Sequence, residues 1–127
     1  MKKILIVIAD YYKDITPTLL SSAKTNLKNF SLKFIKVPGV FEIPVTISKN
    51  IKKYDAFIAL VCVIKGETPH FDFISQASTN AIMKLSIESK KPIGNGIITC
   101  LNKRQAIVRM KKGREAAQAI LSVTLQD

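Results

Sequence analysis

Four apolar runs, separated by stretches of mixed polarity, constrain the fold of this chain more than any other feature. The runs cover residues 3–9, 32–37, 56–64 and 92–99, and the third of them is the longest. The first run is continuously apolar and rich in Ile and Val, which is typical of a strand buried on both faces of a parallel sheet. The four runs together predict four strands, with residues 56–64 in the centre of the sheet.

Helices are predicted between these strands. Thr16 and Pro17 are typical of a helix start, with Thr16 as the N-cap and Pro17 in the first helical position. We expect that helix to run to about Asn29. The same Thr-Pro pair recurs at residues 68 and 69, ahead of a helix over residues 70–89. Its apolar positions, which we expect to face the core, recur every three or four residues: Ile74, Ala77, Ala81 and Leu85.

Two further helical stretches complete the pattern. One starts at about Glu42, and Asn102 with Gln105 three residues later forms a variant capping box for the last one, which is interrupted near Gly113. The resulting order, β-α-β-α-β-α-β-α-α, indicates a parallel sheet with helices on both faces. We therefore expect an α/β fold, a three-layer α-β-α sandwich around a four-stranded parallel sheet, of the flavodoxin-like type.

The composition fits a single domain over residues 1–127, since 47% of the residues are hydrophobic and can form a core. No apolar stretch reaches the roughly 18 residues that a membrane span needs, so no membrane partner is expected. The first apolar run resembles part of a signal peptide, but it stops at Asp10 without a small-residue cleavage site. We expect a cytoplasmic protein, with Cys62 and Cys100 as reduced packing residues.

The formal net charge of +11 has three competing explanations. The positive charge can bind nucleic acid, it can attract a phosphorylated substrate, or it can simply reflect lysine-rich codon usage. The lysines are scattered and no nucleic-acid-binding signature or basic stripe with interleaved aromatics is present. No nucleic-acid partner is therefore expected.

Ligands of parallel sheets bind at the carboxyl ends of the strands, which directs attention to the loops that follow the four runs. Residues 65–70, Lys-Gly-Glu-Thr-Pro-His, join the longest run to a capped helix, whose first N–H groups suit an anion such as phosphate. The segment lacks the P-loop pattern, and Glu67 could repel phosphate, so an ordinary strand-to-helix turn is the alternative.

Four other positions near these loops can carry chemistry, each with a structural alternative. His70 is the only histidine and could move protons, although most single surface histidines are inert. Glu42 could accept hydrogen bonds from a polyol or simply complement a helix dipole. Tyr11 could stack on a planar ring, and Arg109 could bind phosphate or be a solvated charge. One histidine and two distant cysteines form no recognisable metal site.

Taken in order, these segments resemble the lumazine synthase family over nearly the whole chain. The motifs that carry the resemblance are Pro38-Gly39-Val40-Phe41-Glu42-Ile43-Pro44, Val63-Ile64-Lys65-Gly66-Glu67-Thr68-Pro69-His70-Phe71-Asp72, Gly96-Ile97-Ile98-Thr99 with Gln105-Ala106 and Arg109, and Lys112-Gly113-Arg114-Glu115-Ala116-Ala117. The resemblance implies condensation of 5-amino-6-(D-ribitylamino)uracil with 3,4-dihydroxy-2-butanone 4-phosphate, the penultimate step of riboflavin biosynthesis, with no cofactor or metal.

The resemblance also implies roles for individual residues. His70 matches the proton-transfer histidine, Tyr11 the aromatic that stacks on the uracil, and Arg109 the arginine that pairs with phosphate. Residues 40–42 match the segment that holds the ribityl chain, and residues 66–68 the backbone loop that binds phosphate. The full set of implied substrate-binding residues is Tyr11, Val40, Phe41, Glu42, Val63, Ile64, Lys65, Gly66, Glu67, Thr68, Asn95, Arg109 and Lys112.

The family forms pentamers, some of which assemble into larger shells, so the resemblance implies a homo-oligomer of pentamers or higher. Asn95, Arg109 and Lys112 would then complete the site of a neighbouring chain. The chain departs from the family where Tyr12 replaces a common Asn and Asn95 a common Phe. A flavodoxin-like module that binds a flavin or nucleotide without turnover, and a basic nucleic-acid-binding protein, are the alternative functions.

Overall fold

The computed structural model describes residues 2–25, 27–65 and 70–124. Their elements follow the order β1 (Lys3–Ala9), α1 (Thr16–Lys24), β2 (Ser31–Val37), α2 (Glu42–Lys49), β3 (Ala56–Ile64), α3 (His70–Ser89), β4 (Ile93–Cys100), α4 (Lys103–Val108) and α5 (Lys112–Thr124). This is the predicted alternation, and each strand lies within one residue of its predicted bounds.

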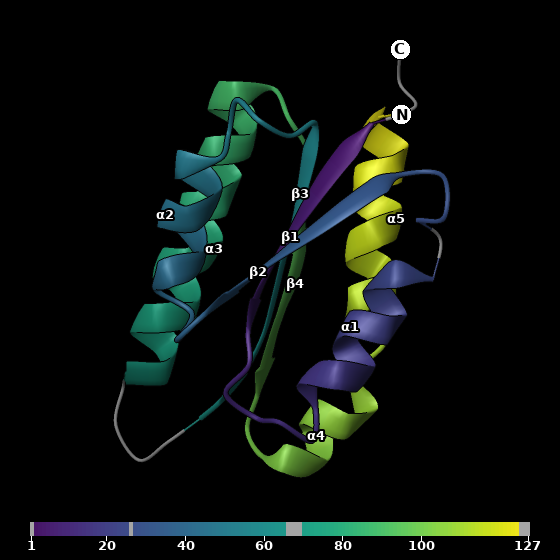
Figure 1. The fold of residues 1–127 in the computed structure, drawn as a ribbon. Helices are drawn as coiled ribbons and strands as arrows, with labels where there is room; N and C mark the ends of the chain where they lie inside the picture. Colours follow the sequence, from purple (N-terminus) through teal and green to yellow (C-terminus); the bar gives the residue numbers. More distant parts are fainter. Residues whose placement is uncertain (1, 26, 66–69, 125–127) are drawn as a thin grey trace.

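All neighbouring strands of the sheet run parallel, in the order β2-β1-β3-β4. Helices α2 and α3 cover one face and α1 and α5 the other, which gives three layers (Figure 1). The predicted α/β sandwich of the flavodoxin-like type is therefore confirmed. Among the described helices, none is long and apolar enough to cross a membrane.

The two central strands bury both of their faces. In β1 the side chains of Ile4, Ile6 and Ile8 pack toward α1 and α5, whereas those at residues 5, 7 and 9 pack toward α2 and α3. This division follows from the two-residue repeat of a strand. It explains why the run lacks polar positions, because neither face reaches solvent.

Two helix starts differ in how well the sequence predicted them. Asn102 is the N-cap of α4, where its side chain accepts a hydrogen bond from the Gln105 N–H, and the Gln105 side chain accepts one from the Leu101 N–H. The prediction that Thr16 caps α1 is wrong. Thr16 is already helical, and its hydroxyl donates to the Tyr12 carbonyl instead of accepting from the helix.

Other details of the helices also differ from the predictions. Helix α1 ends at Lys24, not near Asn29, and Leu27 is buried in the core beyond it. Thr25 and Asn29 are weak helix formers, so burying Leu27 outweighs a longer helix. On α3, residue 77 was expected to face the core, but it is exposed and Ser78 is buried.

Helix α5 lies unusually close to its neighbours because two glycines leave room for it. The break before α5 covers residues 109–111, and Gly113 lies in the first turn of the helix, where an added Cβ would overlap the backbone of α1 at Leu19. A Cβ at Gly94 of β4 would likewise overlap the Ala116 carbonyl of α5. Helix α5 can therefore lie this close to α1 and β4 only because residues 94 and 113 are glycines, which have no side chain.

This close approach predicts that Gly94→Ala destabilises the protein by about 1–3 kcal/mol, because either β4 or α5 must shift to accept the methyl group. Urea denaturation followed by circular dichroism measures the change. Gly39→Ala is the matched control, since its Cβ would meet only the flexible Glu42 side chain at 3.3 Å. Equal stabilities for the two variants would contradict this account of α5 packing.

Candidate functional site

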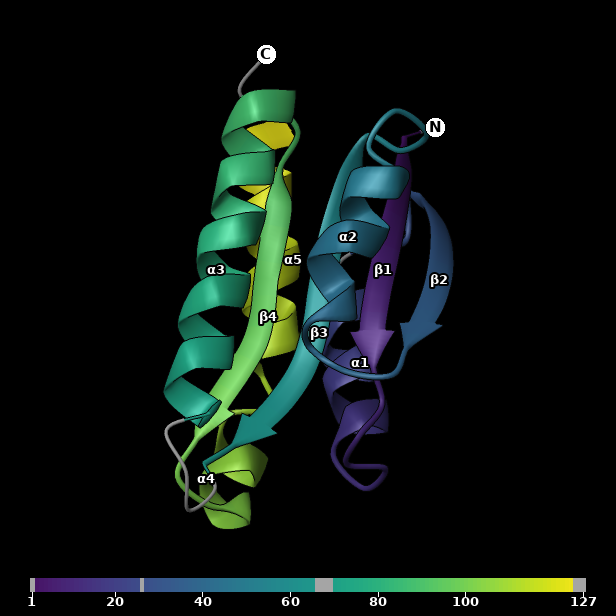
Figure 2. The same ribbon diagram turned by 90° about the vertical axis from the view of Figure 1, so that its left-hand side faces the viewer.

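The loops that follow the four parallel strands gather at one edge of the molecule. They begin at Asp10 after β1, at Pro38 after β2, at Lys65 after β3 and at Leu101 after β4. All four arrowheads point to the same end in Figure 2, where α4 also lies. This carboxyl edge brings together segments that are distant in the sequence, as expected for a ligand site in a parallel sheet.

The first hollow at this edge, the tyrosine pocket, has a volume of about 300 Å³. It is mostly apolar and partly open to solvent, and two adjacent tyrosines form part of its wall. Its lining comprises Tyr11, Tyr12, Gly39, Val40, Val61, Cys62, Val63, Ile64 and Ile74. An apolar hollow flanked by aromatic rings suits a planar heterocycle more than a free phosphate.

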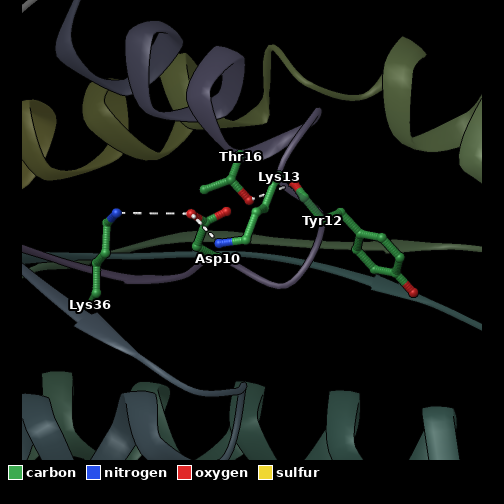
Figure 3. A network of polar contacts seen from close by, with 5 residues as sticks. All are labelled: Asp10, Tyr12, Lys13, Thr16 and Lys36. Atoms are coloured by element: carbon green, nitrogen blue, oxygen red, sulfur yellow. Dashed lines mark hydrogen bonds and ion pairs between the residues drawn. The ribbon is translucent and has the colours of Figure 1, made fainter.

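A small polar network fixes the loop that carries the two tyrosines (Figure 3). The Asp10 carboxylate forms ion pairs with the Nζ atoms of Lys13 at 3.8 Å and of Lys36 at 3.9 Å. The second pair links the end of β1 to the end of β2. The Tyr12 carbonyl accepts hydrogen bonds from the Ile15 N–H and from both the N–H and the hydroxyl of Thr16, each at 3.0 Å. The loop is therefore held at both ends.

The second hollow, the arginine pocket, has a volume of about 360 Å³ and lies between β4 and the junction of α4 with α5. Three of its side chains are cationic and one is acidic. Its lining comprises Ile97, Ile98, Thr99, Val108, Arg109, Lys111, Lys112 and Glu115. This surplus of positive charge suits an anion.

Within the arginine pocket, two cations already have partners in the chain. The Arg109 guanidinium donates to the Thr99 carbonyl at 2.5 Å, and Lys112 lies 3.8 Å from the Glu115 carboxylate. The backbone N–H of Arg109 bonds to the carbonyls of Gln105 and Ala106 at the end of α4. The capped helix α4 thus positions Arg109, which remains exposed to solvent.

No described residue lines both pockets, so the described part of the chain places Tyr11 and Arg109 in two different hollows. Val63 and Thr99 are register partners on β3 and β4, and each lines a different pocket. The predicted ring-binding and phosphate-binding residues therefore occupy two separate half-sites at the same edge of the sheet.

Other predicted site residues have varied positions. Val40 is buried in the tyrosine pocket, Phe41 is 57% exposed, and Glu42 begins α2. Val63 and Ile64 line the tyrosine pocket, and Lys65 follows them exposed. Gly66, Glu67 and Thr68 lie outside the described residues. His70 is the first residue of α3, but its side chain also lies outside what the structure describes.

Asn95 occupies neither pocket. It lies in the middle of β4, where its side chain accepts a hydrogen bond from the Ile97 N–H at 3.0 Å. It also lines a shallow groove of about 200 Å³ between β4 and α3, the α3 groove, together with Thr79, Ile82, Met83, Ser86, Ile87 and Ile93. A group from another molecule that contacts the Asn95 side chain would therefore have to enter the α3 groove.

Sequence reasoning missed Asp10 and Cys62 as parts of this edge. Asp10 directly follows a buried strand, and that position is a signal that could have identified it. The Cys62 thiol is buried beside the tyrosine pocket, and Cys100 is its buried neighbour on β4. Both cysteines are free. Among the described residues, no cluster of His, Cys, Asp and Glu side chains could hold a metal ion.

Burial raises the pKa of the Cys62 thiol to about 12, with a further contribution from the Cys100 thiol. Burial also raises the pKa of Cys100, although the neighbouring Arg109 guanidinium acts in the opposite direction. Both thiols therefore stay protonated at neutral pH. This protonation argues against a nucleophilic role in the reaction, because the thiolate is the reactive form.

These pKa shifts predict very slow alkylation of the native protein by iodoacetamide at pH 8, where on the order of 10⁻⁴ of Cys62 is thiolate. The rate should rise with pH through the alkaline range as the thiolate fraction grows. Mass spectrometry of timed samples measures it, and the urea-unfolded chain, in which both thiols react quickly, is the control. Rapid native labelling of Cys62 at pH 8 would disprove its burial.

Comparison with known proteins supplies a family for this arrangement. The sequence model of the 6,7-dimethyl-8-ribityllumazine synthase family matches residues 1–126. A protein of that name from Corynebacterium kroppenstedtii is 38% identical over 94% of this chain and 80% of its own length. The 6,7-dimethyl-8-ribityllumazine synthase 1 of Rhodopseudomonas palustris is 42% identical over 95% of this chain and 83% of its own. That of Agrobacterium fabrum is 40% identical, covering 94% and 90%.

Proposed function

This chain belongs to the 6,7-dimethyl-8-ribityllumazine synthase family, and we propose on that premise that it catalyses the family's reaction in riboflavin biosynthesis. The amine of 5-amino-6-(D-ribitylamino)uracil condenses with the ketone of 3,4-dihydroxy-2-butanone 4-phosphate. An imine forms with loss of water, phosphate leaves, and closure of the second ring releases water again. The observation that carries the proposal is the family match over residues 1–126.

The tyrosine pocket is the binding site for the ribitylaminouracil in this proposal. Its apolar lining suits the flat pyrimidine, on which the exposed Tyr11 ring can stack. Residues 40–42 lie at the start of α2 beside the pocket, where Val40 contributes to its wall and Glu42 can accept hydrogen bonds from the ribityl hydroxyls. Residues 63–65 complete this side of the site at the end of β3.

The arginine pocket is the binding site for the phosphate in this proposal. The Arg109 guanidinium can turn from the Thr99 carbonyl toward a phosphate, because a charge-assisted pair of bonds to an anion is stronger than one bond to a neutral carbonyl. Lys112 adds a second positive charge to the same hollow. The backbone of residues 66–68 supplies further N–H donors in this proposal, and the net charge of +11 draws the anionic substrate in.

Proton transfer falls to His70, at the start of α3, in this proposal. The reaction needs protons moved onto leaving water and away from the attacking amine, and an imidazole does this near neutral pH. Amine attack on a ketone and loss of phosphate need no electron transfer. Positioning and proton transfer therefore suffice, and the proposal includes no cofactor or metal.

Among the described residues the tyrosine and arginine pockets are separate, and this separation supports a site that a second copy of the chain completes. We therefore propose a homo-oligomer, a pentamer or a larger assembly of pentamers, in which the arginine pocket of one copy faces the tyrosine pocket of the next. Phe73, Met83 and Ile87 on α3 are 68%, 59% and 70% exposed, and such side chains suit an interface between copies. Asn95 lies in the α3 groove on that same surface.

The proposal places one domain, residues 1–127, in the cytoplasm with small-molecule substrates and with no nucleic-acid or membrane partner. The first apolar run forms the buried strand β1, so it contributes to the core of this domain.

The direct test mixes purified protein with both substrates and follows the absorbance of the lumazine product against a control without protein. Product formation well above the spontaneous rate supports the enzyme. If the folded protein binds the ribitylaminouracil tightly but gives no product, a binding module replaces the proposal.

Replacing the histidine gives the sharpest prediction of catalysis. His70→Ala should lower kcat by roughly 10- to 1000-fold while the protein stays folded, because a general acid–base group is lost and water substitutes only in part. Steady-state kinetics with both substrates measures this. Lys52→Ala, an exposed change in the turn before β3 at the opposite edge of the sheet, is the control and should leave kcat unchanged. An unchanged kcat for His70→Ala would remove the proton-transfer role.

Replacing the arginine tests the phosphate site. Arg109→Ala should raise the KM for the ketone phosphate by about 10- to 100-fold, the cost of losing a charged pair of hydrogen bonds, and leave the KM for the uracil nearly unchanged. Arg104→Ala, another exposed arginine of α4, is the matched control.

The same variant also tests whether neighbouring copies share a site. At a low concentration of the ketone phosphate, a refolded mixture of Arg109→Ala and His70→Ala chains should be more active than the sum of the two variants, because some sites then combine two intact halves. Failure of the mixture to exceed the sum of the two variants would place His70 and Arg109 in the same chain's site.

A further inference from the structure

Tyr12 lies directly beside the ring that the proposed function assigns to stacking. The centroids of the Tyr11 and Tyr12 rings are 4.9 Å apart and their planes are inclined at 77°. This is an edge-to-face arrangement, the geometry that aromatic pairs favour. The two rings therefore attract each other in a specific mutual orientation, beyond being adjacent in sequence.

The two tyrosines differ in how firmly they are held. Tyr11 is 71% exposed, so little besides its neighbour limits its motion. Tyr12 is partly buried, and its ring packs against the core cluster formed by β1, β3, α1 and α5. Its carbonyl accepts the three hydrogen bonds from Ile15 and Thr16 that begin α1. Tyr12 is therefore anchored at both its backbone and its side chain.

The Tyr12 ring lies apart from the charged network at the end of β1. In Figure 3 it points away from the Asp10, Lys13 and Lys36 network, on the opposite side of the loop. Burial raises the pKa of its hydroxyl, and the Cys62 thiol and Tyr11 add to that rise while Lys103 opposes it. The hydroxyl thus stays protonated at neutral pH, and Tyr12 presents a neutral ring to the tyrosine pocket that it helps to line.

We propose that Tyr12 is a positioning residue, which holds the Tyr11 ring at the mouth of the tyrosine pocket in the orientation that stacks on the pyrimidine. The assignment rests on the proposed function of the pocket. Without the Tyr12 ring, Tyr11 would sample more orientations in solvent, and ligand binding would have to order it. Tyr12 acts on the ligand through its neighbour and contributes by its ring face and edge, so its hydroxyl is dispensable.

The test compares Tyr12→Leu with Tyr12→Phe. Leucine keeps an apolar side chain in the core but removes the ring, whereas phenylalanine keeps the ring and removes only the hydroxyl. Calorimetry gives the Kd of each folded variant for 5-amino-6-(D-ribitylamino)uracil without the second substrate. An aromatic pair is worth about 0.5–1.5 kcal/mol, so Tyr12→Leu should weaken binding by about 2- to 10-fold and Tyr12→Phe should match the wild type.

A turnover assay separates positioning from general damage. The KM for the uracil should rise in Tyr12→Leu by the same factor as the Kd, while the KM for the ketone phosphate stays unchanged. Equal rises in both KM values would reduce Tyr12 to a structural residue. Equal weakening of binding by Tyr12→Phe and Tyr12→Leu would assign the effect to the hydroxyl, which also overturns the proposal.

A spectroscopic readout keeps this proposal distinct from the proposed function. The NMR signals of the Tyr11 ring protons in the ligand-free protein should shift in Tyr12→Leu, because the ring current of residue 12 is lost, and stay near their wild-type positions in Tyr12→Phe. A protein that binds the uracil with this pattern but gives no product refutes the enzyme and retains the positioning role. Unshifted Tyr11 signals and unchanged binding in Tyr12→Leu refute the positioning role alone.

Discussion

Burial of β1 and β3 between two helical layers is the constraint on which the rest of the structure depends. Both strands lie inside the sheet, with β2 and β4 at its edges, and both of their faces are covered. The buried stretches of such strands carry few polar side chains, so charged and polar residues gather where the strands end. Because all four strands run parallel, those ends lie at one edge, and the two pockets form there. The position of the site is thus a consequence of how the core is built.

Close packing of α5 links this core to the arginine pocket, the proposed phosphate half of the site. Gly94 and Gly113 allow α5 to lie against β4 and α1 without intervening side chains. The first turn of α5 then carries Lys112 to the edge of the sheet, next to Arg109 at the end of α4. A shift of α5 would displace Lys112 and alter the arginine pocket, so these two glycines affect the geometry of the site although neither lines it.

Much of the fold could be predicted from local patterns, whereas the site could be predicted only in part. The two-sided burial of residues 3–9 and 56–64 is visible in an apolar run, and the Asn102 cap in a spacing of three residues. Helix α1 ends early because Leu27 finds a place in the core, which is a tertiary effect that no local pattern contains. The separation of Tyr11 from Arg109 depends in the same way on where β3 and β4 pair. The edge-to-face contact of Tyr12 requires coordinates as well, since two adjacent tyrosines in a sequence have no defined angle between them.

The chemical difference between the two pockets explains why their separation within one chain suits the proposed reaction. A flat pyrimidine gains from apolar walls and an aromatic ring, whereas a phosphate gains from converging cations. In the proposed oligomer the two pockets of one site lie on different copies, so each is held by its own chain. Tyr12 packs against the core cluster formed by β1, β3, α1 and α5, and Arg109 is held at the end of α4. In the proposed oligomer the amine and the ketone meet only where the halves meet, so the effective concentration of one substrate near the other is set by the interface. Under this proposal, assembly and catalysis depend on the same surface, and a change that loosens the interface should lower the rate without touching either pocket.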